Sequence, residues 1–234
     1  MVKQKILIAS IKSWNIENAK ELKKKYQSNF TIKIITEKNE LNLNFLQKFQ
    51  PEIIFFPHWS WKIPKEIYES YECIIFHMTD LPYGRGGTPL QNLIVRGHTK
   101  TKISAIKCVE SLDAGPIYFK EDLSLLGTAE AIFLRASKII FGIMIPKILT
   151  EDIEPKPQKG KTVKFSRRKP EDGDLSNLNS LSEVFDCIRM LDAENYPPAF
   201  LRTKNFVIEF SRASLKHKYI KADVVIKKRK DKNE

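Results

Sequence analysis

Two side chains in the segment 73–120, His77 and Asp113, have the chemistry of a general acid–base pair. His77 follows the apolar run Cys73–Phe76, and open α/β sheets bind their ligands at the carboxyl ends of parallel strands. Asp113 lies in the turn sequence SLDAGP, between two predicted strands. A carboxylate beside an imidazole orients the ring and favours its charged form. Each residue is also common in a structural role, and their spacing alone does not bring them together.

The loop that follows His77 is rich in glycine and proline. Leu81–Pro89 carries Gly84, Gly86 and Gly87 around Arg85. Glycine permits unusual backbone angles and the close approach of a ligand. The same composition also forms ordinary tight turns, so composition alone leaves both interpretations open.

The elements that must position these residues alternate between strand and helix from the N-terminus. This order predicts an α/β fold with a Rossmann-like, open and mostly parallel sheet. The first strands are expected at Ile6–Ser10, Phe30–Thr36, Ile53–Phe56 and Cys73–Phe76, with helices at 15–26 and Leu43–Phe49. Further elements are expected at Pro89–Arg96 (helix), Ile103–Val109 and Pro116–Lys120 (strands) and Thr128–Leu149 (helix).

Composition shifts divide the chain into three predicted parts. Residues 1–150 form the main domain, and 151–162 form a linker because they are rich in Pro, Lys and Gly. Residues 163–234 form a small C-terminal α+β unit that contacts substrate or forms a homodimer. Its expected elements are a helix at Leu181–Leu191 and strands at Asn205–Phe210 and Val224–Ile226, before a frayed tail, Lys227–Glu234.

The overall composition is that of a folded protein. Of 234 residues, 42% are hydrophobic and 29% are charged, which excludes a largely disordered chain. No apolar run reaches the length of a membrane span, so no membrane association is expected. Cys73, Cys108 and Cys187 have no metal-ligand spacing, which predicts buried thiols, no metal and a cytoplasmic location.

The formal net charge of +12 admits a nucleic acid or a small phosphate-bearing substrate. No basic stretch alternates with aromatic residues, as single-strand binders require. Charge alone therefore does not choose between these partners.

The motifs around the acid–base pair resemble those of a known family. The string His77-x-x-x-Leu81-Pro82-x-x-Arg85-Gly86, the Pro89-Leu90 helix and then Leu112-Asp113-Ala114-Gly115 are similar to the folate-dependent formyltransferases. The resemblance covers about residues 1–210 and implies a Rossmann-like fold. It also implies transfer of a formyl group from N10-formyltetrahydrofolate to an amine, with His77 stabilising the formyl oxygen and Asp113 accepting the proton.

The segments beyond the linker most resemble the nucleotide-sugar N-formyltransferases of bacterial surface-glycan pathways. The similar strings are FSRRKPEDGD at 165–174 and YPPAF at 196–200. The resemblance implies a UDP- or dTDP-linked amino sugar as acceptor, with Arg167 and Arg168 either on its diphosphate or simply a surface pair. We expect no nucleic acid as partner, because the C-terminal part is short for a tRNA formyltransferase. Glycinamide ribonucleotide and aminoacyl-tRNA stay open as alternative acceptors. The substrate-binding residues that the resemblance implies are Asp80, Arg85, Gly86, Thr88, Gln91, Tyr196 and Phe200.

The resemblance also implies a folate site and shows one departure. The folate is expected against the loop after the third strand and against the Asp113 turn, with Trp59, Trp61, Ile63, Leu112, Ala114 and Gly115 as binding residues. The family has Asn-x-His at the end of this strand, and the Asn position here is Ile75. Isoleucine cannot donate a hydrogen bond to the formyl oxygen. Either another donor replaces the Asn, with Thr79, Asn92 and loop backbone N–H groups as candidates, or the protein is a catalytically impaired binding homologue.

Overall fold

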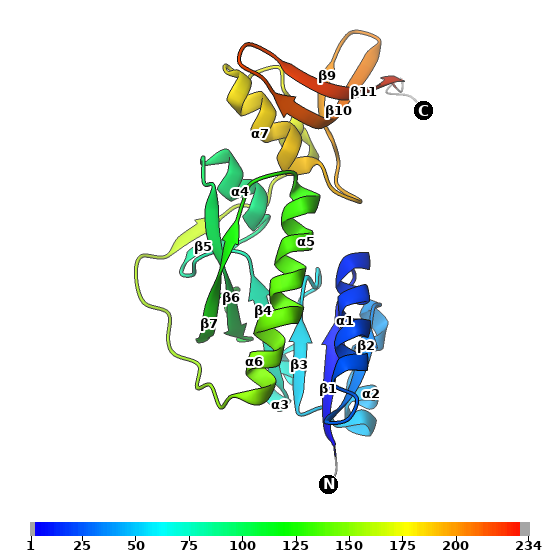
Figure 1. The fold of residues 1–234 in the computed structure, drawn as a ribbon, viewed down its shortest axis with the longest axis vertical. Helices are drawn as coiled ribbons and strands as arrows, with labels where there is room; N and C mark the ends of the chain where they lie inside the picture. The colour runs from blue at the N-terminus through cyan, green and yellow to red at the C-terminus, as the bar shows by residue number, and fades with distance from the viewer. Residues whose placement is uncertain (1–2, 230–234) are drawn as a thin grey trace. The chain divides into compact units, whose positions relative to one another are not determined.

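The computed structural model describes residues 3–229, and the contacts within the chain divide it into two compact units (Figure 1). The first unit comprises 3–85, Thr101–Leu123 and Leu134–Lys164, and the second comprises Gly86–Lys100, Ser124–Phe133 and 165–229. The division differs from the linear one expected from composition, because Gly86–Lys100 groups with the C-terminal part. The domain boundaries at 150 and 163 stay a prediction.

The first unit is built on a six-stranded sheet with the order β2-β1-β3-β4-β6-β7. β1 to β4 run parallel, and β6 pairs with β4 in the antiparallel direction. The runs ILIA and IIFF are apolar at every position, as expected for parallel strands that are covered on both faces. The predicted α/β, mostly parallel sheet is therefore confirmed. The strands are β1 (Gln4–Ala9), β2 (Phe30–Ile35), β3 (Ile53–Phe56), β4 (Glu72–His77), β6 (Lys100–Lys107) and β7 (Ile117–Ser124).

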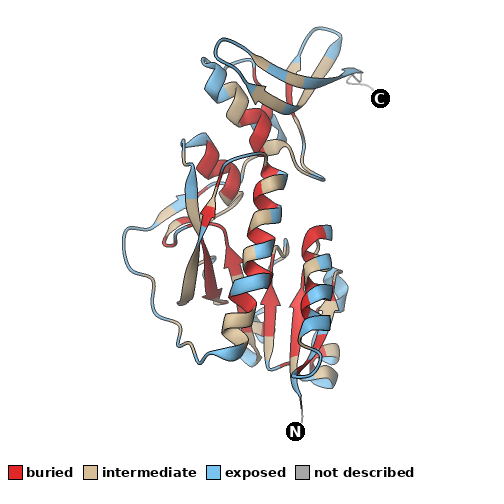
Figure 2. Cartoon of the chain, viewed as in Figure 1, coloured by how far each residue is buried: buried red, intermediate tan, exposed pale blue. Residues whose placement is uncertain are grey.

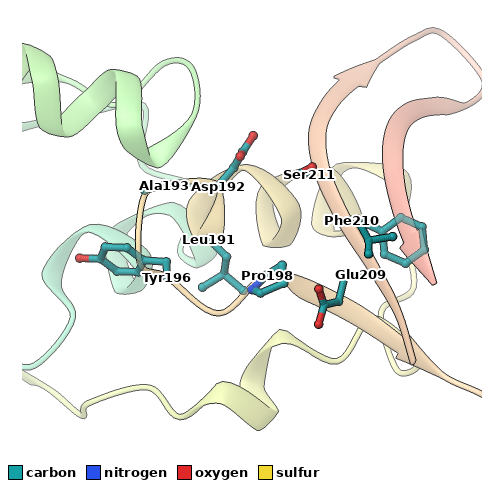
Figure 3. A pocket seen from close by; sticks show the side chains of 9 residues that line it. Leu191, Asp192, Ala193, Tyr196, Pro198, Glu209, Phe210 and Ser211 are labelled. Atoms are coloured by element: carbon teal, nitrogen blue, oxygen red, sulfur yellow. The ribbon is translucent and has the colours of Figure 1, made fainter. Parts of the chain in front are cut away.

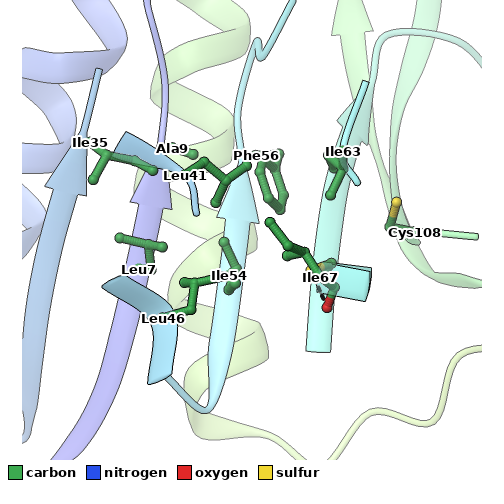
Figure 4. Close-up of a cluster of buried hydrophobic side chains, with 11 residues drawn as sticks. Leu7, Ala9, Ile35, Leu41, Leu46, Ile54, Phe56, Ile63, Ile67 and Cys108 are labelled. Carbon is green, nitrogen blue, oxygen red and sulfur yellow. Dashed lines mark hydrogen bonds between the residues drawn. The ribbon is translucent and has the colours of Figure 1, made fainter. Parts of the chain in front are cut away.

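Helices cover the sheet and bury its side chains (Figure 2). On one face, Leu46 of α2 and Ile67 of α3 pack with Ile54 and Phe56 of β3 in a cluster of buried side chains (Figure 4). Such burial contributes about 1.5–3 kcal/mol for each large apolar side chain. Asn42 fixes the start of α2, because its side chain accepts a hydrogen bond from the Phe45 N–H. The connecting elements are α1 (Ser13–Lys25), η1 (Lys38–Glu40), α2 (Leu43–Phe49) and α3 (Lys65–Ser70).

The helix expected over Thr128–Leu149 is present but is not uniform. It consists of α5 (Ala129–Ile139), the π-helical segment η2 (Ile140–Met144) and α6 (Ile145–Thr150). Pro146 lies in the first turn of α6 and lacks the N–H that a regular helix would use there. Among the helices of residues 3–229, none is long and apolar enough to span a bilayer.

The second unit contains α4 (Pro89–Val95), α7 (Leu181–Leu191) and a three-stranded antiparallel sheet. α7 begins in a capping box, in which Ser180 and Glu183 each bind the backbone of the other. The sheet has the order β11-β10-β9, with β9 (Ala199–Arg202), β10 (Phe206–Leu215) and β11 (Ile220–Lys228). β11 includes Lys227 and Lys228, so the prediction of a frayed tail is wrong for these two residues. Residues 230–234 lie outside the described residues.

Several short elements were not expected from the sequence, among them η1 and β9 described above. β5 (Tyr83–Gly86) and β8 (Val163–Phe165) form a two-stranded sheet, and η3 (Pro170–Gly173) precedes α7. Two of the four residues of β5 are glycines, which are disfavoured in strands. Strand propensity therefore does not predict this strand.

Candidate functional site

His77 ends β4 at the carboxyl edge of the parallel strands. Its side chain is 8% exposed, and its Nε2 lies 2.8 Å from the carbonyl oxygen of Gly84. A carbonyl oxygen can only accept, so Nε2 carries the hydrogen of this bond. The nitrogen left for chemistry is therefore Nδ1.

Asp113 lies in the loop between β6 and β7, with a φ of 52°. Asp and Asn tolerate this left-handed region better than most residues. Gly115, two residues on, is buried, and a Cβ there would collide with the carbonyl oxygen of Lys107. The loop therefore needs an Asp-x-Gly pattern to turn this closely against β6.

The structure brings the two predicted catalytic side chains together. Nδ1 of His77 lies 3.5 Å from Oδ1 of Asp113, and both side chains are 8% exposed. This distance is too long for a good hydrogen bond, and the two groups form an ion pair when the imidazole carries both of its protons. The pair can stabilise a developing negative charge through the imidazole and accept a proton at the carboxylate.

Asp80, expected to contact the substrate, is paired within the protein. Its carboxylate forms an ion pair with Lys120, whose Nζ also donates to the carbonyl oxygen of Leu81 at 2.6 Å. Lys120 thus ties β7 to the loop after His77. The Asp80 side chain is half exposed, so one side of it still faces solvent.

Arg85 is also held by a partner that was not expected. Its Nε and Nη2 lie 3.0 and 2.7 Å from Oε1 of Gln158. Nε2 of Gln158 in turn donates to the carbonyl oxygens of Asp113 and Gly115, at 2.8 and 2.9 Å. Gln158 lies in the segment predicted to be a linker, which therefore contributes to the site.

The residues expected to bind folate differ in how much surface they offer. Leu112 is 71% exposed, beside Asp113, and Ala114 is partly exposed. Trp59 and Trp61 meet edge to face, with ring centroids 4.7 Å apart. These apolar surfaces fit a planar heterocycle. Ile63, in contrast, is buried in the hydrophobic cluster, so its side chain is not available to a ligand.

In the second unit, the expected substrate residues around α4 mainly bind the protein itself. Thr88, with a φ of 45°, precedes α4, and its Oγ1 accepts from the Arg168 N–H at 3.0 Å. Gln91 is 2% exposed and donates to the carbonyl oxygen of Met190. Gly86 has a φ of 111° and approaches the Phe165 backbone too closely for any side chain. Gln91 and Gly86 thus have clear structural roles.

Tyr196 and Phe200 have different surroundings in this unit. Phe200 is buried in β9, with the guanidinium of Arg202 4.0 Å from its ring centroid. The Tyr196 ring stacks on Phe133, and burial raises its pKa to about 12. Tyr196 also lines a hollow of about 250 Å³, in which Glu209 points toward Leu191 and Pro198 (Figure 3). Only Tyr196 of this pair offers surface to a ligand.

Two of the side chains considered as replacements for the family Asn are already engaged. Thr79 is fully buried, with Oγ1 3.4 Å from the carbonyl oxygen of Gly84. The Asn92 amide, in the second unit, donates to the carbonyl oxygens of Gly87, Thr88 and Ser166. Backbone N–H groups of the loops remain as candidates, and Ile75 itself packs against the hydrophobic cluster.

The cysteines do not take part in this site as nucleophiles. All three are buried. Burial, with a smaller effect of nearby Asp113, raises the pKa of Cys108 to about 11, and burial raises that of Cys187 to about 11. The thiols stay protonated near neutral pH, as expected for buried filler.

Comparison with known proteins supports the family and contradicts the predicted sugar acceptor. A family model described as the C-terminal domain of methionyl-tRNA formyltransferase matches residues 170–227. The solved methionyl-tRNA formyltransferase from Clostridium thermocellum is 54% identical, with a TM-score of 0.94, over 96% of this chain and 99% of that one.

More distant relatives share less of the sequence. The methionyl-tRNA formyltransferase of Rickettsia prowazekii is 25% identical over 198 residues, covering 81% of this chain and 65% of the relative. The chain spans about two thirds or less of the curated relatives it matches. A sugar N-formyltransferase from a Shewanella species has the same fold, with a TM-score of 0.68 over 86% of this chain and 93% of that one, at 16% identity.

The predicted acceptor is therefore wrong. A UDP- or dTDP-linked amino sugar and a role in glycan biosynthesis are overturned by the 54% identity to a protein titled methionyl-tRNA formyltransferase. The prediction that no nucleic acid takes part is overturned by the same finding. The physical reason is that the His77 and Asp113 motifs report the shared transfer chemistry, which is the same for every acceptor amine.

Proposed function

Because the chain belongs to the folate-dependent formyltransferase family, we propose that it transfers a formyl group from N10-formyltetrahydrofolate to the α-amine of methionyl-tRNA. The buried contact between His77 and Asp113, at the edge of the sheet where the family motif predicts it, supports the formyl transfer. The 54% identity to the Clostridium thermocellum protein supports the acceptor. The folate co-substrate agrees with this family membership.

The co-substrate supplies an activated formyl carbon. The amine nitrogen forms a bond to this carbon, the bond between the carbon and N10 breaks, and tetrahydrofolate leaves. The amine loses one proton and N10 gains one, so the reaction needs no oxidant, reductant or metal to balance.

Two residues of the first unit have separate roles in this transfer. In its imidazolium form, His77 donates from Nδ1 to the formyl oxygen and stabilises the negative charge that develops there, while the Gly84 carbonyl oxygen accepts from Nε2. The Asp113 carboxylate takes the proton that the amine sheds and passes it on. Backbone N–H groups of the surrounding loops donate to the formyl oxygen in place of the family Asn, since the Ile75 side chain has no hydrogen-bond donor.

Two further observations support methionyl-tRNA as the acceptor. The similarity to the Clostridium thermocellum enzyme extends over nearly the whole of both chains, so it includes the segments outside the shared motifs. The net charge of +12 favours association with a polyanion.

The test is a transfer assay with a choice of acceptors. Purified protein and N10-formyltetrahydrofolate are incubated with methionyl-tRNA, uncharged tRNA or glycinamide ribonucleotide, and the products are weighed by mass spectrometry. We expect one formyl group on the methionyl residue and none on uncharged tRNA. Formylation of glycinamide ribonucleotide alone would refute the acceptor, and no transfer to any amine would refute the activity.

A further inference from the structure

The predicted linker lies against the loop that carries Asp113. The N–H of Lys156 donates to the carbonyl oxygen of Ile117, and the N–H of Ile117 donates back, both at 2.8 Å. A Cβ added at Gly160 would lie 3.8 Å from the ring of Pro82, so the chain passes close to this proline. We call residues 156–160 the strap, because they run from the start of β7 to the loop after His77.

Gln158 is the residue of the strap that reaches the site. Its Oε1 accepts from two nitrogens of Arg85, and its Nε2 donates to the carbonyl oxygens of Asp113 and Gly115. A guanidinium can only donate and a carbonyl can only accept, so these partners fix which way the amide points. Both hydrogens and both acceptor positions of the amide are used.

These bonds complete a ring around the acid–base pair. His77 binds the carbonyl oxygen of Gly84, and the next residue, Arg85, binds Gln158. Gln158 binds the backbone of Asp113, whose carboxylate faces His77. The segment that orients the imidazole and the segment that carries the carboxylate are thus joined by one amide side chain.

We propose that Gln158 is a positioning residue, which holds Asp113 at its working distance from His77. This inference rests on the proposed formyl transfer. Asp113 has a positive φ and belongs to a tight loop, so its place depends on the bonds that its backbone makes. A displacement of about 1 Å at a reacting group costs roughly 10²-fold in rate.

Two variants distinguish the contacts of Oε1 with Arg85 from those of Nε2 with the loop of Asp113. Gln158→Met keeps the length of the side chain and removes every polar contact. Gln158→Glu keeps an acceptor for Arg85 and places a carboxylate against the carbonyl oxygens of Asp113 and Gly115. Gln4→Met makes the same chemical change at an exposed position of β1 and serves as the control.

The readouts are kcat and KM for methionyl-tRNA, the melting temperature, and amide hydrogen exchange over residues 111–116. We expect both Gln158 variants to lose roughly 10²-fold in kcat, with KM and the melting temperature near those of Gln4→Met. Exchange over 111–116 should be faster in both. Wild-type kcat in either variant would overturn the inference, as would a loss of kcat that merely follows a loss of folded protein.

The exchange measurement keeps the inference separate from the proposed function. If the wild type transfers no formyl group, the proposed function fails, yet exchange over 111–116 still reports whether Gln158 holds the loop. Equal exchange in the wild type, Gln158→Met and Gln158→Glu would overturn the inference on its own.

Discussion

At the scale of single residues, His77 and Asp113 are held in place by contacts with the loops around them. Gly84 fixes the imidazole through Nε2, and Gln158 fixes the backbone that carries the carboxylate. Because Nδ1 lies 3.5 Å from Oδ1, too far for a good hydrogen bond, a hydrogen on Nδ1 is available to the formyl oxygen in the proposed transfer. The site is thus organised before the substrates arrive, which is the condition for strong electrostatic stabilisation.

Substitution of His77 or Asp113 should have the strongest effects on kcat. His77→Asn and Asp113→Asn should each lower kcat by about 10²–10⁴, because each removes an acid–base group. Asn suits position 113, since it tolerates the positive φ found there. Steady-state kinetics at saturating substrates checks this, with circular dichroism as the control for folding. Turnover near the wild-type rate in a folded variant would remove that residue from the mechanism.

The sequence identifies the two catalytic candidates but not the residues that hold them. His77 and Asp113 belong to a motif with recognisable spacing. Gln158 and Lys120 do not, since their partners Asp113 and Asp80 lie 45 and 40 residues away. Contacts of this range follow from how the loops fold back, which no local pattern encodes.

At the scale of elements, the connection from β6 to β7 decides where the carboxylate lies. Gly115 lets the loop pass directly against the backbone of Lys107, whose N–H binds the carbonyl oxygen of Pro116. A residue predicted to bind folate thus has a steric role that the sequence motif did not reveal.

Gly115→Ala should therefore destabilise the protein. The added methyl group would collide with a backbone atom that cannot move alone, at a cost of about 1–3 kcal/mol. Gly142→Ala is the matched control, since no atom lies within 4 Å of its added methyl group. It should leave the unfolding free energy unchanged or raise it by about 0.5–1 kcal/mol. Urea denaturation compares the two, and equal stabilities would contradict this account of the loop.

Elements with strong local signals were predicted well, and weak ones were missed. The helix expected at Leu43–Phe49 has these bounds and is capped by Asn42, and that at Leu181–Leu191 starts at the Ser180 capping box. β5 and β8 are short and form only because their partner strand is present. Such strands depend on tertiary contacts, so propensity alone cannot find them.

At the scale of the whole molecule, identity over nearly the full chain supports an acceptor that the motifs could not distinguish. Aminoacyl-tRNA ranked below a sugar acceptor because the part of the chain beyond the predicted linker is short for a tRNA formyltransferase. The Clostridium thermocellum protein, titled methionyl-tRNA formyltransferase, matches this chain over 99% of its own length. A short C-terminal part therefore does not argue against this class of acceptor.

If methionyl-tRNA is the acceptor, its binding should depend on salt. Each phosphate contact releases counterions, so KM for methionyl-tRNA should rise roughly tenfold or more between about 50 and 200 mM salt. KM for N10-formyltetrahydrofolate, a much smaller anion, serves as the internal control and should change far less. A KM for methionyl-tRNA that does not respond to salt would contradict a role of the +12 charge in binding.

Stability should also depend on pH through His58. Burial and the positive charge of Lys12 lower the pKa of His58 from 6.5 to about 4. Below pH 6.5 the unfolded chain binds a proton at His58 that the folded protein does not. The free energy of unfolding therefore decreases as the pH falls toward 4. For this half-buried ring we expect a loss of about 1–3 kcal/mol.

Urea denaturation between pH 7 and 4 checks this, with His58→Asn as the comparison, because Asn also accepts the φ of 59° found there. The variant should show a weaker dependence on pH over this range. The same slope in the variant and the wild type would assign the loss to other groups.

The central claim is that this chain formylates an aminoacyl amine through His77 and Asp113. The most direct measurement is a single-turnover reaction of wild type and Asp113→Asn with N10-formyltetrahydrofolate and methionyl-tRNA, followed by mass spectrometry of the released amino acid. We predict formylmethionine with the wild type and almost none with the variant in the same time. No formylmethionine with the wild type, or equal amounts with both proteins, would contradict the claim.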